Sequence, residues 1–185
     1  MENNNLRQLF IGEIQDLYDA EHQLIEALPK MAEASASPAL RQGFESHLRQ
    51  TEGHAGRLER VFKSLGEEAK RRKCKAMKGL VAEGAEMIDG GFEGAVKDAG
   101  LIGAAQRVEH YEIAAYGTAR AFAELLGDQE SVSLLEQTLK EEKETDEKLT
   151  ELAETINPEA AGSESAGSIG ADRTTIKRKA KSAGR

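Results

Sequence analysis

The sequence has no tryptophan, one cysteine and three prolines, and only 4% of its 185 residues are aromatic. The single cysteine, Cys74, excludes an intrachain disulfide framework. No apolar run approaches the roughly 18 residues that a membrane-spanning helix needs. The first residues, Met-Glu-Asn-Asn-Asn, lack the basic-then-apolar order of a signal peptide. These absences predict a cytoplasmic protein with no membrane segment.

The composition that is present suits an all-helical domain with a proper core. Hydrophobic residues make up 39% of the chain and charged residues 31%, with much Ala, Glu, Leu and Lys. The net charge is −8 but uneven, because residues 159–185 hold six Lys or Arg against three Asp or Glu. Residues 1–158 therefore carry a net charge of −11, and such an acidic body argues against nucleic-acid binding.

Apolar residues spaced three and four apart predict four long helices, over about 6–35, 38–65, 95–126 and 129–156. Asn5 and Ser37 are suited to cap the first two helices, with Pro38 in the first turn of the second. Residues 66–94 form a connection too long for a hairpin, with a short helix near 76–88. A long crossover makes the second and third helices parallel, so the sequence predicts an all-α, ferritin-like four-helix bundle.

The C-terminal residues differ in composition from this bundle. Asn157-Pro158 is expected to end the fourth helix, which gives a domain over residues 1–158. Residues 159–185, rich in Gly, Ser and basic side chains, are predicted to form a disordered tail. The other basic run, residues 70–75, is predicted to be a solvated loop, because it lacks the interleaved aromatics of a nucleic-acid surface.

Polar residues interrupt the apolar stripes of all four predicted helices near their middles. The interruptions are Tyr18, Glu21, Thr51, Glu109, Glu112, Tyr116, Glu142 and Asp146, with His54 one turn from Thr51. A shift of 91 residues aligns Glu21 with Glu112 and Thr51 with Glu142, so the two halves form an internal repeat. In a bundle, these side chains meet at about one height.

Five buried carboxylates need counter-charge, which protons, basic side chains or metal ions can supply. No Arg or Lys lies on the stripes at that height. Carboxylates with an imidazole suit Fe or Mn, and two ions about 3.5–4 Å apart are the usual arrangement. The predicted metal ligands are Glu21, His54, Glu109, Glu112, Glu142 and Asp146. His22, His47 and His110 are predicted to lie outside the site.

Three segments resemble the YciE/YciF family of bacterial stress-associated proteins, within the ferritin-like superfamily. They are Leu17–Leu24 (LYDAEHQL), Ala104–Thr118 (AAQRVEHYEIAAYGT) and Glu141–Asp146 (EEKETD). The segments span essentially the whole predicted domain. The resemblance implies a ferritin-like bundle that is dimeric, carries a di-metal site and is associated with stress responses.

The superfamily pattern has Glu-x-x-His on both the second and fourth helices. Here those places read Thr51-Glu52-Gly53-His54 and Glu142-Lys143-Glu144-Thr145, so one Glu and one His are missing. Glu109 together with Glu112 and Asp146 can compensate. Two hypotheses remain open: a metal-binding oxidase, peroxidase or metal sink that holds two Fe or Mn ions, and a metal-free oligomeric scaffold whose site has decayed.

The predicted partners are metal ions and a second copy of the chain. Extra apolar residues on the first helix, such as Leu9, Leu17 and Leu24, predict a homodimer through that face. Neither a membrane nor a nucleic acid is expected as a partner.

Overall fold

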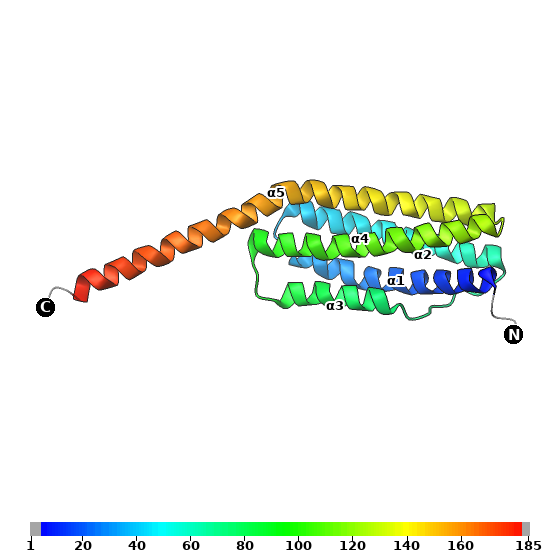
Figure 1. The fold of residues 1–185 in the computed structure, drawn as a ribbon, viewed down its shortest axis with the longest axis horizontal. Coiled ribbons are helices and arrows are strands. Elements are labelled where there is room, and N and C mark those ends of the chain that lie inside the picture. Colours follow the sequence, from blue (N-terminus) through cyan, green and yellow to red (C-terminus); the bar gives the residue numbers. More distant parts are fainter. Residues whose placement is uncertain (1–4, 183–185) are drawn as a thin grey trace.

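The computed structural model describes residues 5–182, with the side chains of residues 5–162, and every regular element in this part of the chain is a helix. The helices are α1 (Leu6–Ala34), α2 (Pro38–Leu65), α3 (Lys75–Asp89), α4 (Gly94–Leu125) and α5 (Gln129–Ser182). Four long rods, α1, α2, α4 and the first part of α5, lie side by side, and α3 runs along their outside (Figure 1). The predicted all-α bundle is confirmed.

The connections give the bundle its topology. α1 packs against α2 and α4, α2 packs against α5, and α3 packs against both α1 and α4. The α3 segment returns the chain to the far end of the bundle, so α2 and α4 run in the same direction (Figure 1). This long crossover with its short helix is the ferritin-like arrangement that the sequence predicted.

The helix ends follow from local chemistry. Asn5 caps α1 by accepting a hydrogen bond of 2.9 Å from the Gln8 amide, and Ser37 caps α2 by accepting one from Leu40. Gly66 ends α2 with a φ of 70°, a left-handed conformation that disfavours residues with a Cβ. Both predicted N-caps are confirmed.

The crossover is anchored to α1 through one buried carboxylate. Asp19 accepts hydrogen bonds of 2.9 Å from both the Cys74 amide and the Arg71 guanidinium, and one of 2.7 Å from Gln23. These contacts fix the residue that precedes α3. The basic run at 70–75 is therefore tied to the bundle at Arg71 and Cys74 and is more than a solvated loop.

The core consists of two apolar blocks with a polar layer between them. One block lies toward the α1–α2 turn and includes Leu28, Leu40 and Phe44. The other lies toward the opposite end and includes Phe10 and Phe62. The polar interruptions of α1, α2, α4 and α5 fall between these blocks. The layer is thus sealed along the bundle axis by apolar side chains on both sides.

The helix α5 is longer than the sequence predicted. It continues across Pro158 to Ser182, so the prediction that it ends at Asn157-Pro158 is wrong. Good helix formers follow the proline, at Glu159, Ala160 and Ala161. Beyond the proline the helix leaves the bundle and projects away from it (Figure 1). Residues 159–182 are therefore helical where a disordered tail was predicted, and the last three residues lie outside the described part of the chain.

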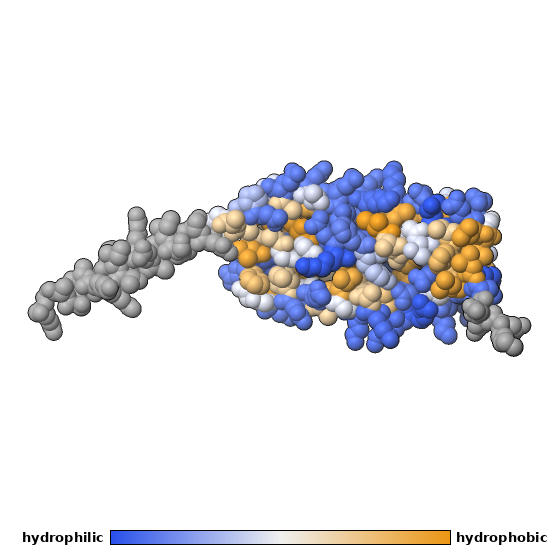
Figure 2. Space-filling model, viewed as in Figure 1, coloured by the Kyte–Doolittle hydropathy of each residue, from blue (hydrophilic) through white to orange (hydrophobic). Residues whose placement is uncertain are grey.

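Two of the three leucines that predicted a dimer serve the chain's own core. Leu17 and Leu24 are buried, whereas Leu9 is 52% exposed. Figure 2 shows apolar side chains gathered at the end of the bundle where α1 begins. The predicted dimer therefore depends on a smaller surface than the sequence indicated, and it stays a prediction. No helix among the described residues is long and apolar enough to cross a membrane.

Candidate metal centre

Four carboxylates and two imidazoles meet in the polar layer, and each long helix contributes at least one of them. They are Glu21 from α1, His47 and His54 from α2, Glu109 and Glu112 from α4, and Glu142 from α5. None of these six residues is more than 4% exposed. Such a concentration of ionisable groups inside a small core is costly unless each charge is compensated.

The six residues form two adjoining groups that share one carboxylate. His47, Glu109, Glu112 and Glu142 each offer one atom to a set that lies within 4.8 Å, and Glu21, His54 and Glu142 form a second such set. Glu142 is thus placed between the two sets. A shared carboxylate between two neighbouring ligand sets is the geometry expected of a two-metal site in a helical bundle.

The facing atoms lie close together without forming hydrogen bonds. His54 Nδ1 is 2.9 Å from Glu142 Oε1 and 3.6 Å from Glu21 Oε1, yet Nδ1 has no hydrogen-bond partner. His47 Nε2, 3.3 Å from Glu109 Oε1, also has none. Groups that crowd one another without aligned hydrogen bonds are arranged as ligands are around a common cation.

Glu112 is the most exceptional member of the cluster. Both of its carboxylate oxygens are buried and have no hydrogen-bond partner, and the same holds for both oxygens of Glu142. More than nine in ten buried polar groups in folded proteins are paired. These two adjacent carboxylates therefore offer four free acceptor oxygens, a set that could hold a cation.

The imidazole of His54 is held in place from its far side. Its Nε2 lies 2.9 Å from Glu141 Oε2, and Arg57 donates two hydrogen bonds of 2.8 Å to the two oxygens of Glu141. Burial raises the pKa of Glu141, but Arg57 and then His54 more than offset it and hold that pKa below its usual value. A carboxylate on Nε2 fixes the proton there and leaves Nδ1 free to act as a ligand.

A buried tyrosine closes the cluster on the side of α1. Tyr116 donates a short hydrogen bond to Glu21 Oε1, which leaves Oε2 as the unpartnered oxygen. Burial, together with the Glu21 and Glu112 carboxylates, raises the pKa of Tyr116 well above its usual value. Tyr116 therefore remains a neutral donor and orients Glu21. The other predicted tyrosine, Tyr18, donates instead to Glu59, outside the cluster.

The histidines supply part of the counter-charge. Burial lowers the pKa of His47, but the Glu109 carboxylate more than offsets burial and raises that pKa to about 9. Burial likewise opposes the charged form of His54, whereas its contacts with Glu142 and Glu21 raise its pKa to about 10. Both rings are therefore imidazolium cations at neutral pH when no metal is bound, and two positive charges face four carboxylates.

The four carboxylates outnumber the two imidazolium charges, and burial together with this excess of negative charge raises the pKa values of two of them. Burial, and then the charges of Glu142, Glu21 and Glu109, raise the pKa of Glu112 well above its usual value. Burial raises the pKa of Glu142 as well, and the two histidines limit the rise to about 7. Near neutral pH the metal-free cluster must therefore hold protons on carboxylates, and divalent cations can replace those protons.

The structure brings together five of the six predicted ligands and excludes Asp146. The Asp146 carboxylate lies 3.4 Å from the Gln106 amide and 3.2 Å from His110, and it is partly exposed. Within residues 142–149 of α5 the buried positions are 142, 145 and 149, so Thr145 takes the inward place one turn after Glu142. The sequence analysis placed the next inward residue four positions after Glu142, at Asp146, whereas the buried face of the helix has it three positions after, at Thr145.

The structure brings His47 into the cluster, so the prediction that His47 lies outside it is wrong. Because the neighbouring Leu48 is apolar, the sequence predicts a buried face for this helix that contains Leu48 and not His47. In the structure Leu48 is half-buried and His47 is buried. The spacing contained a usable signal, because His47, Thr51 and His54 follow one another at steps of four and three. Thr51 is buried as predicted, but its hydroxyl donates to the His47 carbonyl at 3.0 Å.

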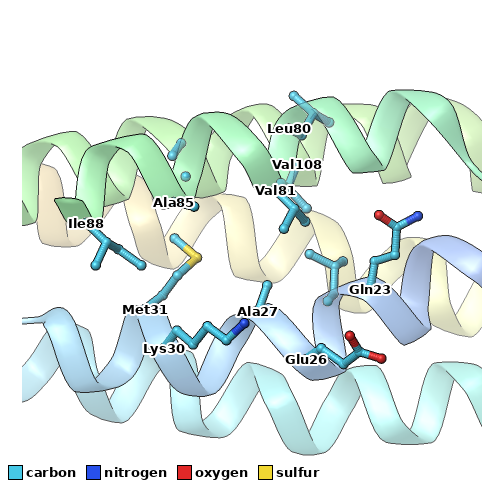
Figure 3. A pocket seen from close by; sticks show the side chains of 13 residues that line it. Gln23, Glu26, Ala27, Lys30, Met31, Leu80, Val81, Ala85, Ile88 and Val108 are labelled. Atoms are coloured by element: carbon cyan, nitrogen blue, oxygen red, sulfur yellow. The ribbon is translucent and has the colours of Figure 1, made fainter. Parts of the chain in front are cut away.

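A hollow outside the polar layer is lined by a different kind of side chain. It occupies about 160 Å³ between α1, α3 and α4 and is lined mainly by apolar side chains such as Met31, Val81 and Ile88. Lys30 and Glu26 stand at its side (Figure 3). None of the six cluster residues lines it. The chemistry of the molecule is therefore concentrated in the polar layer and not in this hollow.

The topology and the buried cluster together define the class of the protein, a ferritin-like four-helix bundle with a carboxylate–imidazole centre. Residues 5–162 match a family described as "Domain of unknown function (DUF892)". Over 154 residues the chain is 46% identical to Protein YciF of Escherichia coli (strain K12). These residues cover 83% of this chain and 93% of YciF. The chain belongs to this family, that of the YciF stress proteins.

Solved structures agree with this assignment. The crystal structure of the E. coli stress protein YciF matches with a TM-score of 0.82 and 45% identity, over 84% of this chain and 98% of that one. YcfI from Rhodopseudomonas palustris, described as a candidate structural protein, matches with a TM-score of 0.78 and 40% identity, over 80% and 95%. A Xanthomonas campestris pv. campestris protein with 23% identity and a TM-score of 0.69 shares the fold alone.

Proposed function

We propose that the chain binds two Fe or Mn ions in its polar layer and acts in the stress response as a metal-dependent bundle. The observation that carries this proposal is the pair of adjacent buried carboxylates, Glu112 and Glu142, whose four oxygens have no hydrogen-bond partner. Protons can neutralise such groups but cannot satisfy four acceptors at once. Two divalent cations between the six side chains satisfy all of them.

The donor set suits these metals. Carboxylates with one imidazole per ion are ligands that Fe and Mn accept readily, whereas Zn sites favour thiolates or several imidazoles. His47, Glu109 and Glu112 would hold one ion, Glu21 and His54 the other, and Glu142 would contact both. Such ions supply one-electron chemistry toward dioxygen or peroxide, which fits an oxidase, a peroxidase or a metal sink.

The protein's own residues prepare the site and shield it. Glu141 and Arg57 orient His54, Tyr116 orients Glu21, and the apolar blocks above and below exclude water. In this arrangement no side chain needs to move far for the ions to bind, because the ligand atoms already converge. The burial that makes the empty cluster costly also strengthens its attraction for cations.

The test is metal content and uptake. Protein purified without chelator is analysed for metal, stripped, and titrated anaerobically with Fe(II) and Mn(II). We expect close to two ions per chain for one of these metals, as the two ligand sets require. Near-zero content with no uptake on titration contradicts the proposal.

A second function, that of a metal-free scaffold, is favoured by one observation. Thr51 and Thr145 stand where the superfamily has a metal-ligating Glu and His, and both are buried. His47 and His54 can also neutralise two carboxylates by protonation. This function is favoured if the cluster takes up no metal and the protein is equally stable with and without chelator.

We also propose that two chains associate at the end of the bundle where α1 begins and α4 ends. Leu9 is 52% exposed, Leu125 75% and Leu126 39%, and an exposed apolar patch favours association. Sedimentation at tens of micromolar should give a dimer for the wild type and a monomer for Leu125→Lys. Phe92→Lys, an equally polar change at the opposite end of α4, is the matched control and should remain dimeric.

A further inference from the structure

We propose that metal ions reach the cluster through a small hollow between α2 and α5, and that His47 and Glu109 are the first ligands they meet. This inference rests on the proposed function, because it concerns the route to the same site. It goes further by proposing that the two ligand sets differ in their access to solvent. One set lies beneath an opening to solvent, and the other is enclosed behind it.

The hollow leads from the surface down to the cluster. It occupies about 50 Å³, which is room for a few water molecules. Gly43, Ser46 and Lys148, all exposed, stand at its mouth, and His47 and Glu109 form its floor. α2 and α5 pack directly against each other, so this opening lies in the seam between the two hairpins.

The floor of the hollow carries the polar atoms that an arriving cation needs. His47 Nε2 and Glu109 Oε2 are buried and have no hydrogen-bond partner. They belong to the ligand set that also contains Glu112 and Glu142. A cation that loses its waters in the hollow therefore exchanges them for an imidazole and a carboxylate, and it can then pass to the carboxylates behind.

The other ligand set, Glu21, His54 and Glu142, has no such opening among the described residues. Tyr116, fully buried, donates to Glu21 and covers it. Behind His54, Arg57 is held in place by Glu141 and by Thr138 at 3.0 Å. Both oxygens of Glu141 are already bonded to Arg57, so this side of the cluster offers an arriving cation no free carboxylate oxygen. Ions for this set must come from the His47 side.

Lys148 at the mouth supplies a direct test, because its exposed charge slows approaching cations without blocking them. We follow the uptake of Co(II) by the stripped full-length protein in a stopped-flow instrument, at low salt. The Lys148→Glu variant reverses a charge beside the route, so its uptake should be about threefold faster or more, an advantage that falls as salt is added. Lys30→Glu makes the same charge change beside the hollow between α1, α3 and α4 and should leave the rate unchanged.

A second pair of variants tests passage rather than approach. A Cβ on Gly43 would lie in ordinary contact with Leu152 Cδ1 at 3.7 Å, so the backbone accepts a side chain here, and Gly43→Leu places its added atoms at the mouth of the hollow. Gly56 lies on the same helix, and a Cβ there meets nothing within 4 Å. We expect several-fold slower Co(II) uptake for Gly43→Leu and an unchanged rate for Gly56→Leu. The final number of ions bound should be the same in all variants.

The outcomes separate the route from the site. If the wild type binds no Co(II), the proposed function fails and the route fails with it. If all variants fill to the same level and neither Lys148→Glu nor Gly43→Leu changes the rate, the site stands and the route is wrong. Rates that change equally in the control variants also overturn the route.

Discussion

The two helical hairpins bring complementary chemistry to equivalent positions of one polar layer. A shift of 91 residues along the chain pairs Tyr18 with Glu109, Glu21 with Glu112, His47 with Thr138, Thr51 with Glu142 and His54 with Thr145. The first hairpin supplies both imidazoles, and the second supplies three of the four carboxylates. Where one hairpin has a ligand, the other often has a threonine. The repeat is retained in position, and among these five pairs only Glu21 and Glu112 retain the same chemistry.

This difference makes each ligand set depend on both hairpins. The set around His47 joins α2 to the carboxylates of α4 and α5, and the set around His54 joins α1 and α2 to Glu142 of α5. Metal bound in either set would therefore link the hairpins. Binding to the folded state alone stabilises it, so the proposed metals should raise the stability of the whole bundle. The predictions below test this division of labour.

The largest effect is expected from Glu142, because it is the residue common to the two sets. Glu142→Gln should remove both ions and reduce metal affinity by more than the roughly 10–100-fold that outer-sphere changes cost. Isothermal titration with Fe(II) or Mn(II) under anaerobic conditions measures this. Glu147→Gln, an exposed position on the same helix, is the control. Retention of two ions by Glu142→Gln contradicts the shared role.

Glu112→Gln should change stability in opposite directions with and without metal. It should lower the melting midpoint of the metal-bound protein by loss of a ligand. It should raise the midpoint of the metal-free protein by on the order of a few degrees, because it removes the cost of burying a carboxyl group whose pKa burial and neighbouring carboxylates raise. Four melts, of wild type and variant with and without metal, give the result. Equal lowering in both states makes Glu112 a purely structural residue.

The metal-free protein should lose stability as pH rises from about 5 to 9. The pKa values of Glu142, His47 and His54 are raised to about 7, 9 and 10, so their protonated forms favour folding. That contribution is complete below the unfolded-state pKa values and is lost as pH passes the folded-state ones. Urea denaturation at pH 5, 7 and 9 measures it. The metal-bound protein should lack this decline, and stability that rises with pH without metal contradicts the cluster's charge balance.

The supports of the two histidines should differ in importance. Glu141→Gln removes the carboxylate that fixes His54 and should weaken binding of one ion by about 10–100-fold. Thr145→Val removes the 3.4 Å contact to His47 Nδ1, together with a hydrogen bond of 3.1 Å to the Glu141 carbonyl, and should weaken the other ion less. Two-step metal titrations resolve the ions. Equal losses in the two variants would show that the two histidines are supported alike.

The smallest effect is expected at Asp146, which pairs with Gln106 and His110 outside the cluster. Asp146→Asn should leave two ions bound and change the free energy of unfolding by no more than about 0.5 kcal/mol. Metal analysis and urea denaturation of this variant check both statements. Loss of an ion would return Asp146 to the ligand set.

The fold could be predicted almost entirely from the sequence, and the site only in part. Helical periodicity and the caps at Asn5 and Ser37 fixed the bundle, because an amphipathic stripe determines which face is buried. The same stripe does not decide, at each turn, which of two adjacent residues points inward. This ambiguity misplaced Asp146 and concealed His47, since steps of three and four fit equally well until neighbouring helices decide which face points inward.

Other features depend on contacts between distant segments. No local pattern links Arg57 to Glu141, 84 residues away, or Tyr116 to Glu21, 95 residues away. The continuation of α5 past Pro158 also lay beyond a local rule, because proline disfavours a helix interior without forbidding it. The sequence thus indicated the ligand types and Tyr116, but not Glu141 and Arg57, which hold His54 in place.

The central claim, that the two ligand sets hold two metal ions, is tested most directly by anomalous diffraction. Crystals of the protein grown with Mn(II) are measured at a wavelength where manganese scatters anomalously. The account predicts two peaks inside the bundle, one among His47, Glu109, Glu112 and Glu142 and one among Glu21, His54 and Glu142, about 3.5–4 Å apart. An anomalous map with no peak in the polar layer, at a Mn(II) concentration that saturates titration, would contradict it.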